Sequence, residues 1–87
     1  MTDQTIVVYS DDGLESERLI SLVGSLGYPL LVYRLGVEFS MKEFRMEFGE
    51  GAEFPQANCG YKHVGSLKQI LAYFNSRGML RGKRDTN

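Results

Sequence analysis

The sequence contains few of the residues that most often build chemical sites. Among 87 residues there are one cysteine, one histidine, two prolines and no tryptophan. A single cysteine excludes an internal disulfide, and with a single histidine it leaves too few ligands for a Cys/His zinc site. No apolar run approaches the ~18 residues that a membrane-spanning helix needs. The formal net charge of -1 argues against a nucleic-acid binder that uses its whole surface.

The composition that remains suits one small α/β domain. Apolar residues make up 43% of the chain, which is enough for one hydrophobic core at this length. Residues 1–4 are mostly polar and do not resemble a signal peptide. We therefore expect a cytoplasmic protein that makes no membrane contact.

Hydrophobic patterns predict four strands and three helices. Continuous apolar runs at 5–10 and 30–35 predict two buried, parallel strands joined by a helix. Short runs at 56–59 and 62–64, separated by Gly60-Tyr61, predict an antiparallel pair. Each predicted helix has apolar residues at helical spacing. These are Leu19, Leu22, Val23 and Leu26, then Met41, Phe44 and Phe48, and finally Leu67, Ile70, Leu71 and Phe74.

Capping signals mark the start of each predicted helix. A polar residue is followed three positions later by a residue that can complete a capping box. The pairs are Asp12–Glu15, Ser40–Glu43 and Ser66–Gln69. Phe39 and Phe44 occupy staple positions around the second pair, and Gly27 and Gly49 predict helix ends.

The last eleven residues differ in composition from the rest. We interpret 1–76 as the folded domain and 77–87 as a basic, flexible tail. Its cations are Arg77, Arg81, Lys83 and Arg84.

The order βαβ-α-ββα is that of a thioredoxin-like fold with a four-stranded mixed sheet. Within it, FPQ, a short strand and KHVGSLKQIL resemble the glutaredoxin pattern of Val-Pro-Gln, strand, Gly-Lys-His-Ile-Gly-Gly and a final helix. The segment FSMKEFRMEFGEGAEFPQ resembles the corresponding part of short, phage-type glutaredoxins. The resemblance covers about residues 5–74 and, for a phage-encoded protein, implies the host cytoplasm.

The resemblance implies a ligand groove. Pro55 corresponds to the cis-proline of glutaredoxins, and Phe54 to the residue whose backbone pairs with glutathione. Gly65 and Ser66 match the Gly-Gly pair at the last helix, where backbone N–H groups receive the γ-glutamyl carboxylate. The residues expected around this groove are Tyr9, Leu14, Phe54, Pro55, Gln56, Gly65, Ser66 and Leu67.

The catalytic motif of the family is missing. The family's Cys-x-x-Cys aligns with Leu14-Glu15-Ser16-Glu17, so Leu14 and Glu17 replace the two cysteines. Thiol–disulfide exchange needs a thiolate nucleophile, which neither side chain can supply. The resemblance therefore implies a redox-inactive relative with no catalytic residue in the motif.

Three other features have both a structural and a functional interpretation. The carboxylates Asp11, Asp12, Glu15 and Glu17 are a candidate metal or acid–base site, although helix capping and the helix dipole favour carboxylates there. An acidic rim should also weaken the binding of anionic glutathione. Cys59 is either a reactive thiol or a small buried hydrophobe, and we favour the second. We interpret His63 as a strand residue near the sheet edge.

Three functional hypotheses follow. The first is a glutaredoxin-like binding module that has no cofactor and holds a protein or peptide partner in the groove, with glutathione as a further candidate ligand. The second is a glutathione-binding protein or thiol–disulfide oxidoreductase that uses Cys59. The third, which the net charge disfavours, is a nucleic-acid accessory protein that uses the basic tail.

Overall fold

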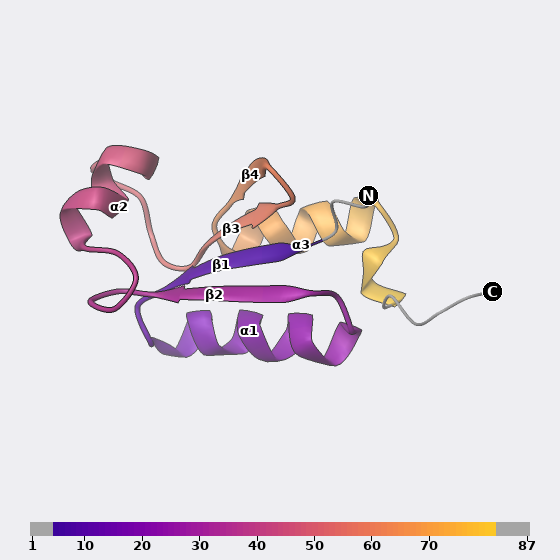
Figure 1. Ribbon diagram of the computed structural model, residues 1–87. Coiled ribbons are helices and arrows are strands. Elements are labelled where there is room, and N and C mark those ends of the chain that lie inside the picture. The colour runs from indigo at the N-terminus through magenta and orange to yellow at the C-terminus, as the bar shows by residue number, and fades with distance from the viewer. Residues whose placement is uncertain (1–4, 82–87) are drawn as a thin grey trace.

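The computed structural model describes residues 5–81 (Figure 1). In chain order the elements are β1 (Ile6–Ser10), α1 (Leu14–Leu26), β2 (Leu30–Arg34), α2 (Met41–Phe48), β3 (Gln56–Cys59), β4 (Lys62–Gly65), α3 (Leu67–Ser76) and the 3₁₀ turn η1 (Met79–Arg81). Within these residues the sheet has the order β2-β1-β3-β4. β1 is parallel to β2, whereas β3 is antiparallel to both β1 and β4. The predicted α/β class and mixed four-stranded sheet are confirmed, and the layout is compatible with a thioredoxin-like fold.

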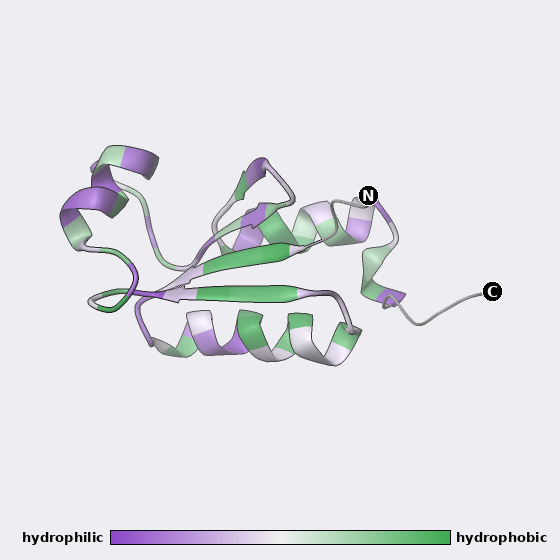
Figure 2. Ribbon diagram, in the orientation of Figure 1, coloured by the Kyte–Doolittle hydropathy of each residue, from purple (hydrophilic) through white to green (hydrophobic). Residues whose placement is uncertain are grey.

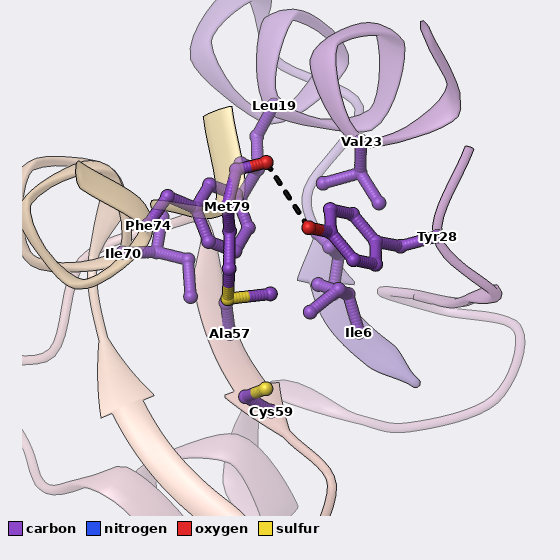
Figure 3. Packing of buried hydrophobic residues seen from close by; sticks show 10 residues of the cluster. Ile6, Leu19, Val23, Tyr28, Ala57, Cys59, Ile70, Phe74 and Met79 are labelled. Atoms are coloured by element: carbon purple, nitrogen blue, oxygen red, sulfur yellow. Dashed lines mark hydrogen bonds between the residues drawn. The ribbon is translucent and has the colours of Figure 1, made fainter. Parts of the chain in front are cut away.

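The hydrophobic core lies on one face of the sheet, under α1 and α3 (Figures 1 and 3). Alternate residues of β1 point to this face, because successive side chains of a strand point to opposite sides. The fully buried side chains of the core include Ile6, Val8, Leu19, Val23, Ile70 and Phe74. Each such side chain contributes about 1.5–3 kcal/mol relative to an exposed position.

The first two strands are less covered than the sequence predicts. β1 alternates between buried and half-buried residues instead of being buried on both faces. β2 is an edge strand, and Leu31 is 44% exposed. In Figure 1, α2 projects past the strand ends rather than lying along the second face of the sheet, and Figure 2 shows that it is largely hydrophilic. The continuous apolar runs of these two strands therefore wrongly predicted that both of their faces are buried.

The start of α2 is built as the sequence predicts. Ser40 Oγ accepts a hydrogen bond from the Glu43 N–H at 3.1 Å, and Glu43 Oε1 accepts one from the Ser40 N–H at 2.8 Å. This capping box satisfies two backbone donors that would otherwise lack partners. The Phe39 and Phe44 rings stack with centroids 5.8 Å apart, which confirms the staple.

The predicted Asp12–Glu15 capping box is wrong. α1 begins after Gly13, and Asp12 adopts a positive φ of 66° outside the helix. Asp11 binds this turn instead, because its Oδ1 accepts hydrogen bonds from the Gly13 N–H at 2.9 Å and from Ser16 Oγ at 3.0 Å. The capping pattern pointed to Asp12, whereas the aspartate that accepts these hydrogen bonds is its neighbour Asp11.

Residues 77–81 belong to the fold, so the prediction of a flexible tail is wrong for them. Met79 is only 7% exposed and packs into the core, where the Tyr28 hydroxyl donates a hydrogen bond to its carbonyl oxygen at 3.1 Å (Figure 3). The Arg77 guanidinium lies 4.5 Å from the centroid of the Tyr73 ring. Lys83 and Arg84 lie outside the described residues. None of the described helices has the length and apolar character needed to cross a membrane.

Candidate functional site

A pocket lies where the start of α3 approaches the loop that precedes β3. It has a volume of about 310 Å³. Its lining residues are Glu15, Glu53, Phe54, Ser66, Leu67, Lys68 and Leu71. The Phe54–Pro55 peptide bond is cis, the state that the resemblance implies, and Pro55 is a fully buried residue of this loop. We call this pocket the Phe54–Ser66 groove.

Gln56 holds the loop that forms one side of the groove. Its side chain is buried, and its Nε2 donates a hydrogen bond to the Glu53 carbonyl oxygen at 2.8 Å. Its Oε1 therefore faces His63 Nε2 at 2.7 Å, so this histidine nitrogen carries the proton and donates. The predicted position of His63, on an edge strand, is confirmed. Gln56 also lines a neighbouring pocket of about 220 Å³, which shares Glu53 and Ser66 with the groove.

Gly65 and Ser66 shape the start of α3. Gly65 has a φ of 137°, and a Cβ atom there would lie 2.1 Å from Gln69 Oε1. That oxygen accepts hydrogen bonds from the Ser66 N–H at 2.8 Å and from Ser66 Oγ at 3.2 Å. The glycine thus leaves room for the side chain that caps the helix. The next two backbone N–H groups, those of Leu67 and Lys68, belong to the first turn of the helix. N–H groups there have no acceptor within the helix, so they can bind an anion.

The four positions that the predicted resemblance aligns with a cysteine motif have separate environments. Glu15 lines the groove. Leu14 is 67% exposed and is not among the lining residues, contrary to prediction. Ser16 is buried and bonded to Asp11, whereas Glu17 forms an ion pair with Arg34 at 3.0 Å. No thiol is present at this helix start.

Arg34 is the residue that the sequence analysis missed. Its guanidinium pairs with both Asp12 and Glu17, and the hydrogen bonds to Glu17 and then Asp12 raise the Arg34 pKa. The rim is consequently less acidic than four carboxylates imply. The parallel register places Arg34 beside Ser10, directly before the aspartates, and this register was the available signal. Across residues 5–81, no cluster of three or more metal-ligating side chains is present.

Tyr9 lies away from the groove, contrary to prediction. Its ring packs edge-to-face against Tyr33, Phe39 and Phe48, with centroid distances of 5.3, 5.4 and 4.9 Å. Alternation along β1 places Tyr9 on the face opposite the Val8 side chain. Tyr9 therefore belongs to an aromatic cluster that adjoins the groove through Phe39, whose ring stacks on Phe54 with centroids 6.1 Å apart.

Cys59 lies at the other end of β3 from the groove. β3 pairs Gln56 with Tyr9 and Cys59 with Ile6, so three residues of extended chain, about 10 Å, separate Cys59 from Gln56. Cys59 is only 9% exposed and belongs to the core (Figure 3). Burial, and then a hydrogen bond with Cys59, raises the pKa of Tyr73. These contacts favour the structural interpretation of this cysteine.

Comparisons of the chain with protein-family models, curated proteins and solved structures found no match.

Proposed function

We propose that this chain is a redox-inactive, glutaredoxin-like binding module that holds a peptide or protein partner in the Phe54–Ser66 groove. The observation that carries the proposal is the pocket of about 310 Å³ between the cis Phe54–Pro55 loop and the start of α3. Binding pockets combine apolar walls with a few placed polar groups. This groove has both.

The lining chemistry suits a short extended peptide. Phe54, Leu67 and Leu71 supply apolar surface, and the Phe54 ring is positioned by stacking on Phe44 with centroids 4.0 Å apart. Lys68 and the first-turn N–H groups of α3 suit a carboxylate. The backbone of Phe54 forms no hydrogen bond to another described residue, so it is available to pair with a ligand backbone.

Two observations support the absence of redox activity. The helix start that carries the catalytic cysteine in glutaredoxins has Leu14 and Glu17 instead. Cys59 is buried at the far end of β3. We expect no glutathione-coupled disulfide reduction, either by the natural chain or by Cys59→Ser. Activity that disappears in Cys59→Ser would contradict this part of the proposal.

The groove can be tested by an amide NMR titration with reduced glutathione, a small peptide that carries carboxylates and an amine. We expect saturable shifts at Phe54, Gln56, Ser66 and Leu67. Lys68→Gln should weaken binding about fivefold, because it removes the cation of the groove. Lys42→Gln makes the same change of charge on α2, outside the groove, and should leave the affinity unchanged.

A partner larger than glutathione is tested by affinity capture from native cell extract. Leu71→Glu places a charge in the apolar wall at a position that is already exposed, so the fold should persist. We expect this variant and Phe54→Ala to lose the partner. No shift with millimolar glutathione, together with no capture that depends on these two residues, would refute the proposed function.

A further inference from the structure

A second pocket lies beside α2, against the aromatic cluster around Tyr9. It has a volume of about 220 Å³. Four half-buried rings line it, those of Tyr9, Tyr33, Phe39 and Phe48, and the buried Phe44 ring adjoins them. We call it the aromatic pocket. The Phe44 ring stacks on Phe54 and so lies between this pocket and the Phe54–Ser66 groove.

The Tyr9 ring stands at a steep angle to the rings around it in the aromatic pocket. Tyr9 meets its three neighbours at interplanar angles of 67°, 70° and 69°. The faces of these rings therefore point in different directions around Tyr9. Because the face of an aromatic ring carries negative potential, such walls attract cations.

Three exposed carboxylates line the same pocket, and no lysine, arginine or histidine is among its lining residues. Glu38 Oε1 accepts a hydrogen bond from the Arg34 N–H at 2.7 Å, and Glu43 Oε1 belongs to the α2 capping box. Within residues 5–81, the Glu47 side chain takes part in no hydrogen bond or ion pair. Burial, and after it the charge of Glu47, raises the pKa of Tyr9, so this carboxylate acts on the ring cluster itself.

We propose that the aromatic pocket binds an arginine side chain presented by a partner peptide or protein. A guanidinium is planar and weakly hydrated, so it can stack on a ring while its N–H groups bond to carboxylates. A lysine ammonium is more strongly hydrated and lacks the planar shape, so it should bind more weakly. The charge of the pocket, its aromatic walls and its volume all match an arginine. This site goes beyond the proposed function, because it uses residues outside the Phe54–Ser66 groove.

The test uses the whole chain and a tripeptide, Gly-Arg-Gly, blocked at both ends. The matched ligand replaces arginine with citrulline, which has nearly the same shape and no charge. In an amide NMR titration we expect saturable shifts at Tyr33, Phe39 and Phe48 with the arginine peptide, and affinity at least about tenfold lower with citrulline. A lysine peptide should fall between the two.

A pair of protein variants separates the pocket from the general charge of the chain. Glu47→Gln should weaken arginine binding about fivefold without affecting the fold, because Glu47 is exposed. Glu50→Gln removes the same charge from the loop after α2, outside this pocket, and should have no effect.

The inference would be overturned by no saturable shift at the pocket, by equal binding of the citrulline peptide, by equal or tighter binding of the lysine peptide, or by equal weakening in the two variants. Shifts confined to Ser66 and Leu67 would also overturn it, because they would place the peptide in the groove. The glutathione titration has separate reporters, so either proposal can fail alone.

Discussion

The two faces of one sheet carry two different hydrophobic regions. Under α1 and α3, aliphatic and aromatic side chains such as Val8, Leu19 and Phe74 are fully buried. On the opposite face, the Tyr9 cluster consists of half-buried rings beside exposed carboxylates. The first region excludes water, whereas the second presents aromatic surface to it.

This difference indicates a division of roles. Burial of apolar area is the main source of stability, so the core should determine whether the chain folds. The aromatic cluster removes less area from water per ring. Rings that remain accessible beside charge are suited to recognition, because they can gain contacts when a ligand arrives.

The largest expected effect is in the core. Phe74→Ala should lower the free energy of unfolding by about 3–5 kcal/mol, because the ring is fully buried and its loss leaves a cavity. Phe48→Ala, in the half-buried cluster, should cost only about 1–2 kcal/mol. Urea denaturation measures both values. Equal losses would show that the two regions contribute alike to stability.

The next effect concerns the C-terminal turn. Met79→Ala should lower the free energy of unfolding by about 2–4 kcal/mol, because Met79 fills the core next to Tyr28. Leu80, its neighbour, is 44% exposed, so Leu80→Ala should change stability by about 0.5 kcal/mol or less. The same denaturation experiment compares them. A neutral Met79→Ala would mean that the core ends at α3.

Met79 also illustrates why part of the fold escaped sequence analysis. The predicted helices and strands rested on periods and caps within a few residues, and local signals of that kind placed β3 and the Ser40–Glu43 capping box correctly. Met79 and Leu80 form an isolated apolar pair among polar and glycine residues, with no apolar period around them. The burial of Met79 depends on Tyr28, 51 residues earlier, and no local pattern contains that contact.

The residues of the candidate site also divide into those that local sequence could place and those that depend on contacts between distant segments. Phe54, Ser66 and Leu67 could be placed from the resemblance because they are close in sequence to Pro55 or to the capped start of α3. The position of Tyr9 could not, because it depends on which face of β1 the ring occupies and on where α2 packs. The pairing of Arg34 with Asp12 and Glu17 likewise required the register between β1 and β2.

A third prediction compares the two regions by local stability. α2 has eight residues and one buried side chain, whereas α1 has thirteen residues and three. Short elements with few buried contacts open more readily. Native-state hydrogen exchange should give α2 amides an opening free energy at least ~1 kcal/mol below that of α1 amides. Equal protection in both helices would mean that the aromatic cluster holds α2 as firmly as the core holds α1.

The smallest effect comes from two glycines, one in each region. A Cβ atom would meet nothing within 4 Å at either Gly24, inside α1, or Gly36, which has a φ of +85° in the loop between β2 and α2. An added methyl group would therefore meet no neighbour at either position, and the two glycines differ only in their backbone conformation.

Gly24→Ala should raise the free energy of unfolding by about 0.5–1 kcal/mol, because alanine loses less conformational entropy in a helix. Gly36→Ala should lower it by about 1 kcal/mol, because a left-handed residue with a Cβ is strained. Thermal and urea denaturation of the pair measure the difference. A gain in stability from Gly36→Ala would show that the loop can shift away from its positive φ, and that the wall of the aromatic pocket formed by Phe39 is less fixed than its contacts indicate.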